Sequence, residues 1–201
     1  MLPSGSGADC KRRQMVIHWR RKGGETMRFE RLTDETDLRY NKAMELYAIS
    51  FPAHEQRRLA SQKRILGDEA YHFMLLYEEE TFVGTALYWE QEEFLYLEHF
   101  CIEPIHRSKG YGAKALALLI QSGKTVILEI DPPVDELSCR RKGFYLRCGF
   151  AENPYPHVHP PYHPDTPGHP LVILSAPDAI DEGTYERLSR YLQTHVMADV
   201  Y

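Results

Sequence analysis

Hydrophobic and polar residues follow two different periods along the chain, and the period of each segment predicts a strand or a helix. Residues 27–32, MRFERL, alternate with a period of two, as a strand does. Three runs rich in aromatic and β-branched residues, YHFMLLYE, TFVGTALYW and EFLYLEHFCI, follow one another across short polar stretches, which predicts an antiparallel meander. Two later runs, KTVILEIDPP and HPLVILSA, predict two more strands.

Helical spacing fills the intervals between these strands. Thr33 and the acidic residues after it predict a helix start, and hydrophobic residues then recur at helical spacing until Pro52. Further helices are predicted over 54–66, up to about residue 121, over 135–149 and over 184–196. The order β-α-α-β-β-β-α-β-α-β-α predicts a three-layer α/β domain, with helices on both faces of a mixed, mostly antiparallel sheet.

A chain of 201 residues can bury one substantial core, so we expect one domain. Residues 1–26 differ from the rest because they hold six Lys and Arg against two acidic residues. They fit a basic arm, a disordered tail or translated upstream sequence. The last explains most, because purine-rich codons for RKGGETM would form a bacterial ribosome-binding site before Met27. We therefore predict a disordered or non-native leader over 1–26 and a domain over 27–201.

Charge and hydropathy exclude several classes of partner. The formal net charge is -5, which does not favour general binding to nucleic acids or anionic membranes. No hydrophobic run approaches the roughly 20 residues that span a bilayer, and no secretory signal is visible, so we expect a cytoplasmic protein. The four cysteines contain no CxxC pair, which favours reduced thiols over a disulfide or zinc framework.

The segment HRSKGYGAKAL, residues 106–116, places glycines and cationic side chains directly before a predicted helix. The first N–H groups of a helix have no internal acceptor and lie at the positive end of the helix dipole. Glycine lets a phosphate approach these groups, and Arg107 and Lys109 add positive charge. Taken alone, the turn fits a phosphate site or a plain strand-to-helix connection, since neither GxxxxGK[ST] nor GxGxxG is present.

Two motifs together are more specific than this turn. Arg107, Gly110 and Gly112 spell R-x-x-G-x-G directly after a strand that ends in FCIEP. After the next predicted strand, the segment GFYLRCGF fits F-Y-x-x-x-G-F. This pair of motifs, in this order, resembles the GCN5-related N-acetyltransferase (GNAT) superfamily. The resemblance implies the acyl-CoA N-acyltransferase fold and acetyl-CoA as cosubstrate.

The resemblance also assigns roles to residues. A loop wraps the pyrophosphate of acetyl-CoA, and its residues are Arg107, Ser108, Lys109, Gly110, Tyr111 and Gly112. The peptide groups of Phe100, Cys101 and Ile102 pair with the pantetheine arm as an added strand pairs with a sheet edge. The strand VILEIDPP splays away and opens a slot for the acetyl group, where a backbone N–H near Ile102 meets the thioester oxygen. Tyr145 stands where many of these enzymes protonate the departing thiolate, and a packing role is its alternative.

A protonated amine acceptor must lose a proton, to a side chain or a water chain, before its nitrogen attacks. Glu98 is the first candidate for this general base and Glu129 the second. Strand alternation places Glu98 on the face of Phe100 and Ile102. His99 is then expected on the opposite face of the strand. Burial is expected to raise the pKa of the Glu98 carboxyl. The alternative is a salt-bridged or solvent-reaching carboxylate, and the two glutamates could share the site.

In the GNAT superfamily the acceptor pocket lies between the first two helices and the segment after the fifth strand, here ISFPAHEQRR and NPYPHVHPPYHPDTPGHP. The predicted acceptor-binding residues, which suit a cationic amine, are Glu55, Tyr155, His159 and Tyr162. The second segment holds four histidines and fits a metal site, an acceptor-lining loop or a surface loop. We expect no metal, because the spacing matches no known ligand set.

The resemblance implies an N-acetyltransferase that moves an acetyl group directly to a primary amine of a small molecule or peptide. A non-catalytic acyl-CoA sensor or interaction module on the same fold is the alternative. The resemblance is also compatible with a homodimer. The family often has Asn and Ala where this chain has Ser138 and Arg141, which puts one side-chain hydrogen bond to the pantetheine arm in question.

Overall fold

A computed structural model describes residues 16–20, 26–198 and 200, and a nine-stranded sheet runs through this part of the chain. The strands are β1 (Val16–Arg20), β2 (Thr26–Leu32), β3 (Tyr71–Glu78), β4 (Thr81–Glu90), β5 (Phe94–Ile102), β6 (Thr125–Ile130), β7 (Ala151–Glu152), β8 (His157–His159) and β9 (His169–Ala176). They pair in the order β1-β2-β3-β4-β5-β6-β9-β7, and β8 pairs with β9. Strands β5 and β6 are parallel and the other described pairs are antiparallel, which confirms the predicted mixed sheet.

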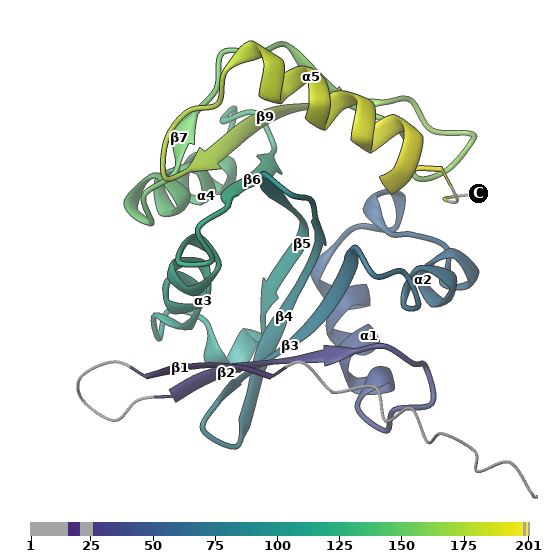
Figure 1. Cartoon of the computed structure of the whole chain (residues 1–201), viewed down its shortest axis with the longest axis vertical. Coiled ribbons are helices and arrows are strands. Elements are labelled where there is room, and N and C mark those ends of the chain that lie inside the picture. The colour runs from purple at the N-terminus through teal and green to yellow at the C-terminus, as the bar shows by residue number, and fades with distance from the viewer. Residues whose placement is uncertain (1–15, 21–25, 199, 201) are drawn as a thin grey trace, which may run out of the picture.

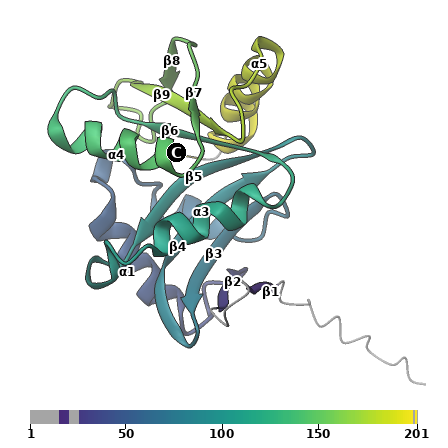
Figure 2. The same cartoon turned by 90° about the vertical axis from the view of Figure 1, so that its left-hand side faces the viewer.

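Helices cover both faces of this sheet. They are α1 (Tyr40–Ser50), α2 (Leu59–Ile65), α3 (Tyr111–Ile120), α4 (Glu136–Arg147) and α5 (Glu182–Tyr191), with short 3₁₀ turns at Ala53–Glu55 and Pro104–His106 and a π-helical turn at Leu192–Val196. In Figure 1, α3 and α4 lie on one side of the sheet and α1 and α2 on the other. Figure 2 views the molecule from the side of α3 and α4, with the sheet behind them.

Each face of the sheet has its own hydrophobic core. Alternate residues of β3 divide between the two, so that Phe73 packs toward α1 and α2 while Met74 packs toward α3. Because both faces are covered, β3 and β4 are buried at nearly every position, which explains their continuous hydrophobic sequences. The hydrophobic stripe of the terminal helix, Leu188, Leu192 and Val196, is buried in the first of these cores.

Helix α1 begins later than the sequence predicted. We expected Thr33 to cap it, but its first residue is Tyr40. The side chain of Asp34 accepts a hydrogen bond from the N–H of Thr36 at 2.7 Å, and that of Asp37 accepts one from the N–H of Arg39 at 2.9 Å. These local turns compete with helical geometry, which is the usual effect of aspartate outside a cap. The predicted helix over 54–66 is likewise shorter, a 3₁₀ turn followed by α2.

Part of the predicted leader pairs with the sheet. Strand β1 lies within residues 1–26 and pairs with β2, which we did not predict, while residues 1–15 and 21–25 lie outside the described residues. The proposal that the leader is non-native therefore stays a prediction. Among the described residues, no helix combines the length and hydrophobicity that a membrane span requires.

Strand β5 carries a bulge at Glu98, and this bulge corrects the predicted alternation. Leu87 of β4 pairs with His99 and Tyr88 pairs with Leu97, so Glu98 has no partner on β4. A bulge shifts the following residues to the other face of a sheet. Glu98 and His99 therefore both point toward α1 and α2, on the face opposite Phe100 and Ile102.

We predict that Gly84→Ala destabilises the protein, because β4 passes very close to β5 at this position. A Cβ at Gly84 would collide with the carbonyl oxygen of Cys101 and lie 3.0 Å from the Ile102 Cδ1. Backbone atoms cannot give way cheaply, so the free energy of unfolding should fall by about 1–3 kcal/mol. Chemical denaturation measures this loss. Gly67→Ala is the control, since its Cβ would meet one atom at 3.9 Å, and equal stability of the two variants would contradict the prediction.

Candidate active site

A cavity of about 1300 Å³ opens where β5 and β6 separate. Their parallel pairing ends at Leu97 and Leu128, as the predicted splay requires. The predicted cofactor residues in its lining are Phe100, Cys101, Ile102, Arg107, Ser108, Gly110, Tyr111 and Gly112. The predicted catalytic and acceptor residues in its lining are Glu55, Glu98, Glu129, Tyr145, His159 and Tyr162. The residues of the two motifs and of the acceptor segments thus meet in one space.

Two predicted site residues lie outside this lining. Lys109 is exposed on the turn before α3. Tyr155 stacks on Tyr185 with ring centroids 4.4 Å apart, and its hydroxyl donates to the carbonyl of Ile180 at 3.0 Å. The prediction that Tyr155 faces the acceptor is therefore wrong in this structure, because the ring packs against α5 instead.

The turn before α3 is shaped to bind a phosphate. Ser108 and Gly110 adopt left-handed backbone conformations, with φ of 62° and 84°, and no side chain caps α3. Such turns direct consecutive N–H groups toward one point, which makes an anion site at a helix N-terminus. Gly112 serves a different purpose, since a Cβ there would lie 3.3 Å from the Phe144 Cζ. The residues present therefore fit the pyrophosphate of acetyl-CoA.

The edge of β5 beyond Leu97 is the predicted pantetheine site. The described pairing with β6 stops there, while Phe100, Cys101 and Ile102 stay paired with β4 on their other side. The Cys101 thiol points away from the α3 side and lies 3.2 Å from the Thr85 hydroxyl. Burial raises the pKa of this thiol, so it stays protonated at neutral pH.

Tyr145 lies on α4 and lines the cavity. The helix is fixed by a capping box, in which Asp135 and Ser138 bond each other's backbone N–H groups at 2.7 and 3.1 Å. The side chain of Ser138 is thus engaged at the start of its own helix. Burial raises the pKa of Tyr145 to about 12, and Arg141 lowers it by a smaller amount.

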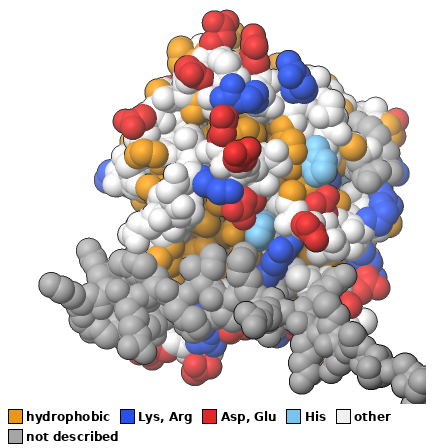
Figure 3. All heavy atoms as spheres, in the orientation of Figure 1, with side chains coloured by type: hydrophobic (Ala, Val, Ile, Leu, Met, Phe, Trp, Pro, Cys, Tyr) orange, Lys and Arg blue, Asp and Glu red, His pale blue; other side chains and the backbone are white. Residues whose placement is uncertain are grey.

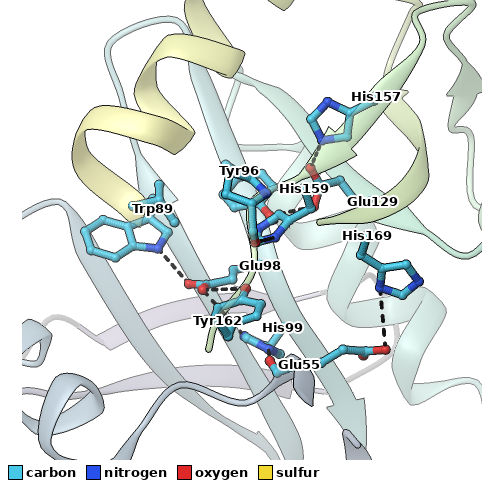
Figure 4. Close-up of polar contacts among 12 residues, drawn as sticks. Glu55, Trp89, Tyr96, Glu98, His99, Glu129, His157, His159, Tyr162 and His169 are labelled. Carbon is cyan, nitrogen blue, oxygen red and sulfur yellow. Dashed lines mark hydrogen bonds and ion pairs between the residues drawn. The ribbon is translucent and has the colours of Figure 1, made fainter. Parts of the chain in front are cut away.

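Glu98 is fully enclosed and saturated with hydrogen bonds, as Figure 4 shows in part. Its Oε1 accepts from the Arg57 Nε and from the Tyr162 hydroxyl, each at 2.9 Å. Its Oε2 accepts from the Trp89 Nε1 at 2.7 Å. Burial alone would raise its pKa, but the positive charge of Arg57, then His99, and these hydrogen bonds hold the pKa below its ordinary value. The expected rise in pKa is wrong, and Glu98 is the salt-bridged carboxylate of the alternative interpretation.

Glu129 has a different set of partners on the other wall of the cavity (Figure 4). Its Oε2 accepts from the Tyr96 hydroxyl at 2.8 Å, and its Oε1 bonds the His157 Nε2. The Nε2 of His159 lies 3.8 Å from Oε2. Burial favours the protonated acid, but His159, His157 and Tyr96 together lower the pKa of Glu129.

A third polar group lies farther along the lining. The Glu55 Oε1 lies 3.5 Å from the His54 Nε2 and 4.0 Å from the His169 Nδ1, and the Asp131 Oδ1 lies 3.4 Å from the His169 Nε2. Burial, followed by the charge of Asp131, raises the pKa of Glu55. The ligand atoms of His54, Glu55 and His169 all lie within 4.8 Å of one another, which makes this group a candidate for metal binding. The absence of a metal stays a prediction.

Charge is mixed on the face of the molecule that Figure 3 draws. On the face shown in Figure 3, acidic, basic and histidine side chains are interspersed with hydrophobic ones. Arg141, on the basic helix α4, pairs with Asp131 at 2.6 Å.

Sequence analysis missed the residues that complete the polar groups. Arg57 was not singled out, although its guanidinium is buried against Glu98 and donates to the Val196 carbonyl at 2.6 Å. The signal in the sequence that could have pointed to a residue such as Arg57 was Glu98 itself, in the middle of a predicted strand. A buried carboxylate requires a buried cation or hydrogen-bond donors nearby. His99 lies on the predicted face, opposite Phe100 and Ile102, but the hydrogen bond from its Nε2 to the carbonyl of Glu55 at 2.9 Å was not predicted.

The fold, the phosphate turn and the free edge of β5 together define an acyl-CoA-dependent acyltransferase. A model of the acetyltransferase (GNAT) family matches residues 39–150, which include the turn, β5 and Tyr145. The chain belongs to this family of acetyltransferases, as its two motifs predicted. Acetyl-CoA is accordingly its cosubstrate.

Solved structures agree with this assignment. A protein from Bacteroides thetaiotaomicron assigned to the GNAT acetyltransferases has 29% identity and a TM-score of 0.79, over 84% of this chain and 97% of its own. An acetyl-CoA-bound GNAT acetyltransferase from Elizabethkingia anophelis has 13% identity and a TM-score of 0.50, over 74% of this chain and 96% of its own. An aminoglycoside 6'-N-acetyltransferase with coenzyme A has 13% identity and a TM-score of 0.52, over 73% of this chain and 94% of its own. The last two share the fold alone. Among curated proteins, none matches the chain.

We predict that Arg57→Met destabilises the protein by about 3–5 kcal/mol at pH 8, because it leaves the Glu98 carboxylate buried without a cation. The native pair holds the pKa of Glu98 low, so its contribution is present at neutral pH and lost as the pH falls below about 4. In the variant, burial raises the pKa of Glu98, so the carboxyl takes up a proton as the pH is lowered. The difference in the free energy of unfolding between wild type and variant should therefore become smaller at pH 5 than at pH 8. Denaturation at both pH values tests this. Exposed Arg58→Met is the control, and a deficit independent of pH would contradict the prediction.

Proposed function

We propose that this acetyltransferase moves the acetyl group from acetyl-CoA directly to a primary amine of a small molecule or peptide. One observation carries the proposal. A continuous cavity joins the phosphate turn and the free edge of β5 to a wall of carboxylates and imidazoles. The first part fits the cosubstrate, and the second fits a cationic nitrogen next to the place where the thioester would lie.

The charge of the acceptor wall supports an amine. Within the described residues, Glu129 contacts a phenol and two imidazoles but no lysine or arginine, so its negative charge has no permanent counterion. Glu55 adds a second carboxylate to the same lining. A partly desolvated negative site attracts an ammonium ion more strongly than it would in water. We propose Glu55, His159 and Tyr162 as acceptor-binding residues.

Tyr145 is the proposed proton donor to the departing thiolate. Its pKa of about 12 keeps the phenol protonated at neutral pH, while a thiolate is a strong enough base to take that proton in the transition state. The raised pKa of Cys101 disfavours an acetylated cysteine as intermediate. The acetyl group therefore passes directly to the acceptor.

Glu98 receives a positioning role in this proposal. Its carboxylate is shielded from solvent and bonded to Arg57, Trp89 and Tyr162. Its pKa is lowered as well, so Glu98 lines the cavity only as a weak base whose oxygens are already engaged. It holds the Tyr162 hydroxyl in place on the acceptor wall. Removal of the proton from the amine falls to the wall that contains Glu129.

The test is a panel of five amines: spermidine, glucosamine, L-lysine, tyramine and a peptide with a free N-terminus. We expect acetyl-CoA and CoA each to raise the melting temperature, and at least one amine to yield CoA thiol and an N-acetylated product by mass spectrometry. Stabilisation without turnover would favour the acyl-CoA sensor. No stabilisation would contradict the proposed cofactor site.

Tyr145→Phe should lower kcat by roughly 10²-fold or more, because it removes the proton donor while keeping the ring. Binding of CoA, measured by calorimetry, should stay close to that of the wild type. Tyr40→Phe is the matched control, since the Tyr40 hydroxyl is buried without a hydrogen-bond partner in the described part of the chain and lies outside the cavity. Unchanged turnover in Tyr145→Phe would reject the role of Tyr145.

A further inference from the structure

His159 has one ring nitrogen whose proton is fixed by its surroundings. The side chain is 4% exposed and lies on β8, beside Glu129 (Figure 4). Its Nδ1 lies 2.6 Å from the carbonyl oxygen of Pro160. A carbonyl oxygen only accepts hydrogen bonds, so Nδ1 must carry a proton. In the neutral imidazole this leaves the lone pair on Nε2.

That Nε2 is buried and makes no hydrogen bond within the described residues. An unsatisfied buried acceptor costs free energy, so it calls for a partner that the protein itself does not supply. The ring stacks on Tyr162 with centroids 5.0 Å apart and an interplanar angle of 23°, which fixes its orientation. Because His159 lines the cavity, a donor bound there can supply the missing partner.

A negative charge without a permanent cation among the described residues lies beside this atom. The titratable groups around His159 are Glu129 from β6, Tyr96, Glu98 and His99 from β5, His169 from β9, and His157 and Tyr162 from its own segment. Arg57 neutralises Glu98, whereas Glu129 has no such cation. With neutral imidazoles, the group around Glu129 carries one negative charge. A proton on the His159 Nε2, 3.8 Å from the Glu129 Oε2, brings that charge to zero.

We propose that His159 is the general base of the acetyl transfer, and that its Nε2 takes a proton from the ammonium group of the acceptor. This inference rests on the proposed function. The freed nitrogen lone pair attacks the thioester carbonyl, the C–N bond forms and the C–S bond breaks. Tyr145 gives its proton to the thiolate and regains one from the new amide nitrogen. The proton held by His159 is the one that the overall reaction releases to solvent, while Glu129 stabilises the imidazolium.

The other buried imidazole on this wall is less suited to the task. The Nε2 of His99 donates to the carbonyl of Glu55, and its Nδ1 lies 3.9 Å from the Glu98 Oε1, which already accepts from Arg57. Burial, together with the positive charge of Arg57, lowers the pKa of His99. A proton on His99 would therefore face a carboxylate that is already neutralised.

The experiment compares wild-type protein with His159→Gln on the amine panel between pH 7 and 10, and with hydrazine at pH 8. We expect kcat/KM of the variant to fall by about 10²-fold at pH 7. The defect should shrink as the pH rises and free amine forms. At pH 8 it should be smaller with hydrazine, about half of which is unprotonated, than with spermidine, which is almost fully protonated. His163→Gln is the matched control, because His163 belongs to the same segment, bonds the carbonyl of Ala53 and lies outside the cavity lining.

Two outcomes would overturn the inference while leaving the proposed function intact. One is wild-type activity of His159→Gln at pH 7. The other is an equal loss at every pH and with hydrazine, which would indicate a structural role for the ring. The CoA-induced rise in melting temperature shows whether the variant is folded. Failure of the wild type on every amine would instead contradict the proposed function.

A measurement on the wild type alone tests the premise without any acceptor or variant. Nitrogen-15 NMR of the imidazoles, with His159 assigned through its bonds to the backbone, should find Nδ1 protonated and Nε2 unprotonated at pH 8. The opposite tautomer would remove the free base and overturn the proposal.

Discussion

The site depends on the place where two parallel strands stop pairing. Beyond Leu97 and Leu128 the peptide groups of β5 no longer meet β6, and the bulge at Glu98 begins at the same point. A separated strand pair leaves N–H and C=O groups without partners, and only a ligand or water can satisfy them. The cavity, the predicted pantetheine site and the polar groups around Glu98 and Glu129 all lie at this one interruption of the sheet.

The two glutamates at the interruption illustrate how surroundings decide the role of identical side chains. Glu98 faces Arg57, forms a closed ion pair and is sealed by Trp89 and Tyr162. Among the described residues, the partners of Glu129 are a phenol and two imidazoles, which are neutral or can become charged. The first arrangement stabilises the fold at neutral pH, since the pKa of Glu98 is lowered. The second leaves a negative charge that a cationic acceptor or a transferred proton can neutralise.

Much of the fold could be predicted from local patterns. The hydrophobic runs of β3, β4 and β5 and the helix stops at Pro52 and Gly149 are local signals, and they placed most elements in the right order. The start of α1 failed because side-chain turns at Asp34 and Asp37 compete with the helix. The short strands β7 and β8 were missed because two- and three-residue pairings with β9 leave no periodicity in the sequence.

The sequence by itself indicated the cosubstrate through its resemblance to the GNAT superfamily, because each of the two motifs is made of residues close together in the chain. The turn of the first motif also depends on a local property, since Gly110 permits its left-handed backbone conformation. The sequence also predicted two segments that contribute to the lining of the cavity, 49–58 and 153–170. Only the tertiary structure decided which face Glu98 occupies, that Arg57 neutralises it, that Tyr155 packs against α5 and that His159 meets Glu129. These contacts join segments far apart in the chain, and the bulge at Glu98 moves one side chain to the other face of the sheet. Neither composition nor residue spacing predicts such contacts.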